Sequence, residues 1–522
     1  MEKRFSIVIA FFAILGLLLS VGTCYAASDS DTLRIANPSD VKKLDPIHIM
    51  DAPSSRVADL ICDHLATYDY SGEVVPELAK SWEFSEEGDE ITFYLREDVK
   101  FHDGTEFDAE AVKFNFERIL DPDEASSARE KYSEVIEDIE VVDDYTIRFE
   151  LTAPNAAFID LYIIDNATMI ISPASVEKYG EDVALNPVGT GPFEFDEYKQ
   201  ASHVRLLKNE DYWDGAPKLE EVVFKPIPEL QSRIAELESG GVDLIFRVPP
   251  EQLEGLEQHS DISLQKSPYP SIRGLWFNLG RDVFEDKQVR KALAYGVDSD
   301  TIHEALLQGV AVPGKSIVPV ESWAYNEDVP KYGFDMEKAA RLLDEAGWVD
   351  EDGDGVREKG DMELSFTIMS PDGRYLRDKE ICEAVTHNWE DLGVEAKTEV
   401  LEWGGFIDNL FAEEFEMVFL GWMQSTFEPA KFINPMVKTG GRSNYFNYSN
   451  SELDELLEQG TRTFDQEQRK EIYAEAQEVY MEDAHFISLY NHLGIVAHNK
   501  DLKDYRYTAS RSLDLLQAYK ES

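Results

Sequence analysis

The sequence has little cysteine, few cations and only one long apolar run. It contains 3 Cys in 522 residues, which excludes a disulfide-built scaffold and a cysteine-built metal protein. Its 49 Lys+Arg stand against 104 Asp+Glu, so the formal net charge is −55. A surface of this charge repels phosphate backbones and anionic membrane faces, which argues strongly against nucleic-acid binding.

Several motifs of enzymes are also absent. The chain has no Gly-x-Ser-x-Gly and no His-Glu-x-x-His, so two common routes to hydrolase chemistry are missing. Paired carboxylates carry no weight here, because 104 acidic residues guarantee some pairs by chance.

What is present is enough to build a large folded protein. Hydrophobic residues make up 43% and aromatic residues 11% of the chain, a composition that supplies a substantial core. The excess of carboxylates repels itself at low salt and is screened at high salt. Adaptation to a salty environment is therefore one hypothesis, and simple solubility outside the cell is the other.

The N-terminus has the three parts of a secretory signal. Met1–Arg4 is basic, Ile7–Val21 is apolar, and Cys24-Tyr25-Ala26 precedes Ala27 as a small-x-small cleavage site. We expect residues 1–26 to be removed, leaving a protein that is secreted, periplasmic or associated with the cell surface. An uncleaved anchor and a lipid on Cys24 are the alternatives.

Strand-like and helix-like patterns are mixed along the chain. Alternating apolar residues predict half-buried strands over Glu90–Glu97 and Tyr145–Leu151. Apolar residues at helical spacing predict four helices: one that follows Asp108, one around Val289–Leu293, one from Asp335 to Gly347, and one over Gln466–Tyr480. No fixed period is present, so the fold class is α/β and not a repeat array.

Five motifs follow one another in a fixed order. They are Leu44–Pro46; Pro76–Glu83 with Leu95–Thr105; Pro187–Phe193 with Lys208–Trp213; Val289–Asp298; and Lys338–Trp348. In this order, and behind a secretory signal, the chain resembles the family 5 extracellular solute-binding proteins of ABC transporters, the peptide- and nickel-type family that includes dipeptide- and oligopeptide-binding proteins. The resemblance runs from about Asp31 to the C-terminus.

The resemblance implies a two-lobed, hinged clamp like that of periplasmic binding proteins, with a discontinuous first lobe. Lobe I would comprise 27–57, 190–272 and 487–522, an insert domain 58–189 would pack on it, and lobe II would be 273–486. A small solute, peptide-like or a metal chelate, would be trapped between the lobes and passed to a permease with a cytoplasmic ATPase. The protein would be a monomer, not an enzyme, and would require no cofactor. A secreted hydrolase and a surface receptor or scaffold are the alternatives.

The resemblance also places candidate ligand contacts in lobe II. Dipeptide binders of the family commonly have an Asp near the position of Ser425, which is absent here, so we expect weak binding of ordinary dipeptides. Arg residues are candidates because a guanidinium fork holds a carboxylate by two parallel bonds. The candidates are Trp276, Asn278, Arg374, Trp422, Glu428 (in place of the missing Asp), Arg442 and Tyr445.

An acidic segment has the spacing of a calcium loop. Its carboxylates occupy loop positions 1, 3, 5 and 12, with Gly355 at position 6. The predicted ligands are Asp350, Asp352, Asp354 and Asp361. The alternative is an exposed acidic turn in a very acidic protein.

Overall fold

The computed structural model describes residues 31–69, 72–124, 126–424, 426–507 and 513–521. The predicted signal peptide 1–26, with Cys24, and Ser425 lie outside the described residues. Among the described residues, no helix is both long and apolar enough to cross a membrane. Cys62 and Cys382 are buried free thiols.

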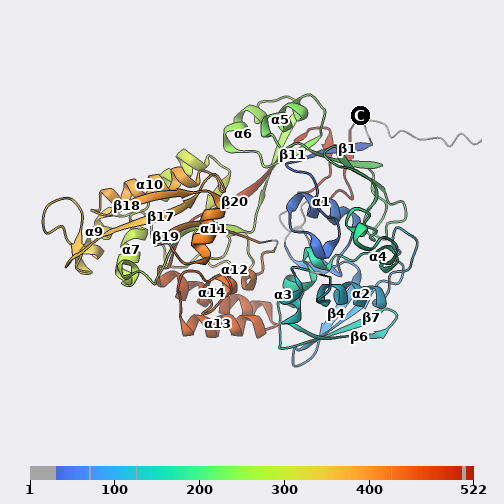
Figure 1. The fold of residues 1–522 in the computed structure, drawn as a ribbon, viewed down its shortest axis with the longest axis horizontal. Helices are drawn as coiled ribbons and strands as arrows, with labels where there is room; N and C mark the ends of the chain where they lie inside the picture. The colour runs from blue at the N-terminus through green and yellow to red at the C-terminus, as the bar shows by residue number, and fades with distance from the viewer. Residues whose placement is uncertain (1–30, 70–71, 125, 425, 508–512, 522) are drawn as a thin grey trace, which may run out of the picture.

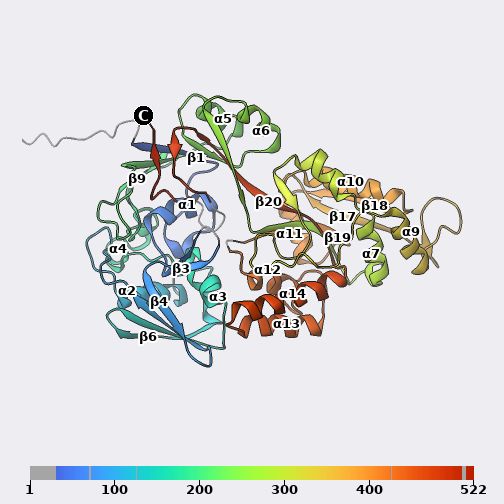
Figure 2. The same ribbon diagram turned by 180° about the vertical axis from the view of Figure 1, so that it is seen from behind.

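The molecule has two lobes joined near one edge (Figures 1 and 2). The elements of lobe I are β1 (Thr32–Asn37), α1 (Ala52–Ile61), β8 (Phe193–Lys199), β9 (His203–Lys208), β10 (Glu221–Pro226), α5 (Leu230–Glu238), β11 (Leu244–Phe246), α6 (Pro250–Glu257), β12 (Ile262–Pro268), β21 (Leu502–Lys503) and β22 (Tyr519–Lys520). Those of lobe II are β13 (Ser271–Phe277), α7 (Lys287–Tyr295), α8 (Ser299–Ile302), β14 (Ala311–Pro313), α9 (Met336–Glu345), β15 (Glu358–Lys359), β16 (Met362–Glu363), β17 (Ser365–Pro371), α10 (Asp378–Glu390), β18 (Glu395–Leu401), α11 (Trp403–Phe411), β19 (Met417–Met423), α12 (Pro429–Val437), α13 (Ser451–Arg462) and α14 (Gln466–Glu482). β20 (Phe486–Asn499) belongs to both lobes.

One twelve-stranded sheet runs through both lobes, in the order β18-β17-β19-β13-β20-β11-β1-β10-β9-β8, with β12 and β14 also paired to β20. The hinge is a ribbon of β12, β13 and β20. β12 pairs antiparallel with the lobe I half of β20, and β13 pairs with its lobe II half. The chain crosses from lobe I to lobe II at Tyr269 and Pro270, which lie between β12 and β13. The predicted boundary at 272/273 therefore falls inside β13, a strand of the hinge itself.

The insert has a core of its own. Its elements are β2 (Ala66–Tyr68), β3 (Val74–Pro76), β4 (Ala79–Phe84), β5 (Glu90–Leu95), α2 (Ala109–Leu120), α3 (Arg129–Ser133), β6 (Ile136–Asp143), β7 (Thr146–Leu151) and α4 (Pro173–Tyr179). The four-stranded sheet β4-β5-β7-β6 buries alternate residues of β5 and β7. The Asp108 side chain caps α2 at Ala111 N. The predicted strands and this helix are confirmed.

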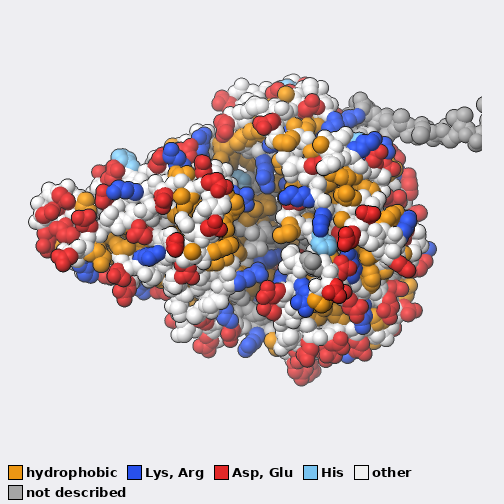
Figure 3. Space-filling view, viewed as in Figure 1, with side chains coloured by type: hydrophobic (Ala, Val, Ile, Leu, Met, Phe, Trp, Pro, Cys, Tyr) orange, Lys and Arg blue, Asp and Glu red, His pale blue; other side chains and the backbone are white. Residues whose placement is uncertain are grey.

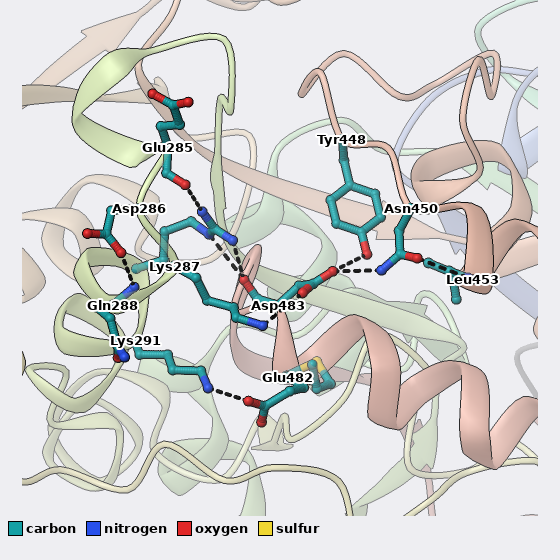
Figure 4. Close-up of polar contacts among 12 residues, drawn as sticks. Glu285, Asp286, Lys287, Gln288, Lys291, Tyr448, Asn450, Leu453, Glu482 and Asp483 are labelled. Atoms are coloured by element: carbon teal, nitrogen blue, oxygen red, sulfur yellow. Dashed lines mark hydrogen bonds and ion pairs between the residues drawn. The ribbon is translucent and has the colours of Figure 1, made fainter.

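The helices of lobe II cover both faces of its sheet. The predicted helices at α7, α9 and α14 are confirmed. Figure 4 shows how the end of α14 is held before the chain enters β20. The Asp483 carboxylate accepts hydrogen bonds from Tyr448 Oη and Asn450 Nδ2, both at 2.9 Å, and its carbonyl accepts one from Arg290 Nη2 at 2.7 Å. Burial would raise the pKa of Asp483, but the hydrogen bonds to its carboxylate and the nearby charge of Lys287 outweigh this effect and hold the pKa below its usual range.

Candidate functional site

In each lobe, the ends of parallel strands face the other lobe. In lobe II, β17 is parallel to both β18 and β19, so these three strands end at one edge, beside the hinge. In lobe I, β1 is parallel to β10 and β11, whose ends also approach the hinge. Loops at the carboxyl ends of parallel strands are the usual place for a ligand in α/β folds. The space-filling view shows a hollow between the lobes, with Lys or Arg and apolar side chains inside it (Figure 3).

On the lobe II side, two arginines and two aromatic rings form a continuous stack. The Arg374 guanidinium lies 4.6 Å from the centre of the Trp403 ring, and that of Arg273 lies 4.8 Å from the centre of the Tyr375 ring. Trp403 and Tyr375 meet edge to face, with ring centres 6.4 Å apart. The stack draws on β13, on the loop after β17 and on the start of α11.

Arg273 is buried without a carboxylate partner in the described part of the chain. Its Nη1 donates to the carbonyls of Ile272 (2.8 Å) and Trp422 (3.1 Å). Its Nη2 has a contact of 3.7 Å with the sulfur of Met423, a weak acceptor. Burial lowers the pKa of Arg273 and the positive charge of Arg374 lowers it further, yet an arginine stays charged in proteins.

On the lobe I side, Arg247 follows the last residue of β11. It is exposed, and its φ of 59° places a non-glycine residue in the left-handed region, where strained residues cluster at functional sites. Its backbone N–H donates to Ile495 O of β20 at 3.1 Å. Next to it, the Arg56 guanidinium lies 4.0 Å from the centre of the Phe246 ring. Burial lowers the pKa of Arg56, and the charge of Arg247 contributes to this lowering.

A histidine on the shared strand lies between these two groups. Burial lowers the pKa of His492 to about 4, and the charges of Arg273 and Arg247 act in the same direction. The first of these arginines belongs to the lobe II side and the second to lobe I. Both therefore act on one point of β20 from opposite sides of the hinge.

At the opposite edge of the hollow, the insert touches lobe II through a buried polar network. Tyr68 Oη donates to Asp160 Oδ1 at 2.8 Å and also bonds Thr426 Oγ1 of lobe II. Arg469 Nη2 donates to Glu428 Oε1 at 2.6 Å. Burial and the nearby Asp160 carboxylate raise the pKa of Glu428 to about 7, although Arg469 opposes this shift. Backbone contact is direct as well, since Ala156 N donates to Thr461 O at 2.8 Å.

The structure contradicts three of the predicted ligand contacts. Trp276 has no exposed surface and stacks on Phe446 inside lobe II, because both faces of the central strand β13 are covered. The buried Asn278 amide donates to the carbonyl of Phe415 at 2.9 Å and thus holds a loop. Glu428 is 1% exposed, pairs with Arg469 and caps α12. These three residues have structural roles.

The other predicted residues lie in different places. Arg374 is part of the aromatic stack. Trp422, on β19, is half-buried, and its indole N–H has no acceptor within the described residues. Tyr445 packs on Phe411 within lobe II. Arg442 is exposed at the far edge of the hollow, where its charge acts on Tyr162 of the insert.

Sequence reasoning missed Arg247, Arg273, Tyr375 and Trp403. The hinge pairing that brings Arg273 to β20 joins residues more than two hundred positions apart, so no local pattern shows it. Trp403 did carry a signal, since it lies two residues after the end of β18, a strand that ends at the ligand edge.

The acidic loop after α9 brings together a different set of carboxylates from the predicted one. Oxygens of Asp350, Asp352 and Glu358 lie within 4.8 Å of one another. Asp354 instead accepts a hydrogen bond from Val356 N at 2.8 Å, and Asp361 is not in the group. Asp350 also accepts from Gly353 N and Gly355 N, as in a tight exposed turn.

Comparison with known proteins agrees with this architecture. Residues 73–444 match the family model described as bacterial extracellular solute-binding proteins, family 5 Middle. The chain belongs to this family of solute-binding proteins. Among curated relatives, a dipeptide-binding protein of Escherichia coli K12 is 31% identical over 436 residues, which cover 79% of this chain and 80% of that protein. The glutathione-binding protein GsiB of Shigella boydii is 30% identical over 494 residues, 93% of each chain.

Solved structures of other proteins have the same fold. The DppA protein of Helicobacter pylori, in complex with the peptide STSA, is 28% identical with a TM-score of 0.74, covering 95% of this chain and 99% of that one. HbpA2 of Haemophilus parasuis has a TM-score of 0.86 at 24% identity, covering 94% and 100%. The predicted two-lobed α/β clamp is confirmed, as is the solute-binding role.

Proposed function

We propose that this solute-binding protein acts outside the cell as the receptor of an ABC importer. It captures one small solute between its lobes and delivers it to a permease driven by a cytoplasmic ATPase. The observation that carries this proposal is the hinge. In both lobes, the carboxyl ends of parallel strands face the same strand, β20. Rotation about this ribbon closes the hollow over a solute. The protein works without catalysis, as a monomer, after removal of residues 1–26.

Peptide-like solutes and metal chelates are the candidate cargo, since the relatives include dipeptide-, glutathione- and nickel–histidine-binding proteins. Small-angle scattering tests the clamp directly. We expect the radius of gyration to fall when a bound solute closes the lobes, together with a rise in melting temperature. A panel of peptides and metal chelates that produces neither change would contradict the proposal.

Two further measurements separate the alternatives. A hydrolase would release products from the panel, whereas a solute receptor returns each compound unchanged. A signalling receptor would share the closure, but deleting its gene would leave solute uptake intact. We expect deletion to abolish high-affinity uptake of the cargo.

A further inference from the structure

Three arginines gather around the hinge without a carboxylate partner among the described residues. Arg205, Arg148 and Arg357 each pair with a carboxylate on the outside of the molecule. Around the hinge, Arg247, Arg273 and Arg374 form no ion pair with any carboxylate among the described residues, although the chain carries 104 acidic residues. A cation that is kept apart from such an excess of carboxylates remains available to an anion from outside.

These arginines are placed to act together. Arg273 pairs with Tyr490 in the β13–β20 ladder, and Arg247 donates its backbone N–H to Ile495. The two attachment points are five residues apart on one strand, which corresponds to roughly 16 Å along β20. An arginine side chain extends for several ångströms, so the two guanidinium groups can reach a single small solute that lies between them. Arg374 is the third donor group, held in place by Trp403.

We propose that the solute is a compact anion with two or more carboxylates, held by Arg247 from lobe I and by Arg273 and Arg374 from lobe II. This inference rests on the proposed function and adds the chemical class of the cargo. Arg273 can offer Nη2, which now contacts only sulfur, and the indole N–H of Trp422 is buried without an acceptor among the described residues. Both groups are donors, as an acceptor-rich ligand requires.

The same charges give a reason for closure. Closure brings the positive charges of Arg247 and Arg273 nearer to each other, so their repulsion opposes closure without a solute. A solute with carboxylates at both ends neutralises both groups and removes this repulsion when the lobes close. The net charge of −55 does not forbid binding, because exposed charges are screened beyond about 8–10 Å at physiological salt whereas the arginines act at contact distance.

Calorimetry with a matched peptide pair tests the inference. The panel is Glu-Glu, Gln-Gln, Ala-Ala, Lys-Lys, glutathione and tricarballylate, added to the mature protein. We expect Glu-Glu, glutathione or tricarballylate to bind at least about tenfold more tightly than the uncharged Gln-Gln. Equal or tighter binding of Gln-Gln, Ala-Ala or Lys-Lys would overturn this inference and leave the proposed function intact. Failure of every compound to bind or to compact the protein would count against both.

Substitutions of Arg247 test whether this residue binds the anionic solute. Arg247→Gln should weaken binding of the tightest anion at least about tenfold, and Arg247→Lys should restore part of it. Arg341→Gln, the same change at an exposed arginine of α9 in lobe II, is the matched control and should have no effect. Circular dichroism and melting temperature establish that each variant is folded. Unchanged anion affinity in folded Arg247→Gln would exclude the proposed anchor.

Discussion

The two edges of the hollow differ in how most of their arginines are held. At the hinge edge, Arg377 pairs with Glu251 of the other lobe, but Arg247, Arg273 and Arg374 form no ion pair with a described carboxylate. At the closing edge, Arg469 and Glu428 lie 2.6 Å apart in a buried network with Asp160 and Tyr68. Buried charges that pair with each other inside the protein serve the fold, whereas arginines without counter-ions around a hollow can bind the anionic groups of a ligand. The predictions below test this division.

The largest effect is expected at the closing edge. Arg469→Gln removes the partner of a buried carboxylate and should lower the free energy of unfolding by about 3–5 kcal/mol. Arg247→Gln should change it by no more than about 0.5 kcal/mol, since that side chain is exposed. Urea denaturation of both variants gives the comparison. A large loss for Arg247→Gln would place it among the structural charges and weaken the contrast between the edges.

The closing edge should also depend on pH. The pKa of Glu428 is raised from 4.5 to about 7, so the folded protein keeps a proton that the unfolded chain releases. Stability is therefore lost as pH rises through this window, by an amount on the order of 3 kcal/mol in total. Glu428→Gln should remove this slope between pH 5 and 7, as measured by urea denaturation at each pH. Glu455→Gln, on the exposed face of α13, should retain it.

A smaller effect concerns the aromatic support of the hinge arginines. Trp403→Ala removes the ring under Arg374 and should weaken binding of the tightest solute in the panel about tenfold, in the range of a cation–π contact together with lost packing. Phe411→Ala, on the same helix with 60% of its side chain exposed, is the control. If both variants bind normally in calorimetry, the stack supports lobe II alone.

The smallest effect is expected at the acidic loop after α9, where carboxylates gather in place of cations. If Asp350, Asp352 and Glu358 hold Ca²⁺, saturating the site should stabilise the protein by about 1–3 kcal/mol. Melting temperature with and without 5 mM CaCl₂, at constant ionic strength, measures this gain. Asp350→Asn should abolish it. A gain that persists in Asp350→Asn would indicate general screening of the acidic surface.

Much of the fold could be predicted from the sequence because its signals are local. Ile91, Phe93 and Leu95 alternate on β5, and Asp108 caps α2, so both elements are visible in a short window. The site was less predictable. Trp276 lies on a central strand that is buried on both faces. An alternation of apolar and polar residues therefore cannot show which of its side chains reach solvent. The role of Arg273 depends on a partner strand far along the chain.

The shared strand β20 has a consequence for the range of cargo. Because the lobes are joined by a continuous ladder instead of a loose linker, they have in effect one degree of freedom, a rotation about that ribbon. A longer or bulkier solute then leaves a wider angle between the closed lobes, and a shorter solute leaves a narrower one. The same residues of the two lobes face the solute in each case. Selectivity by size would be graded, while selectivity by electrical sign would be strict.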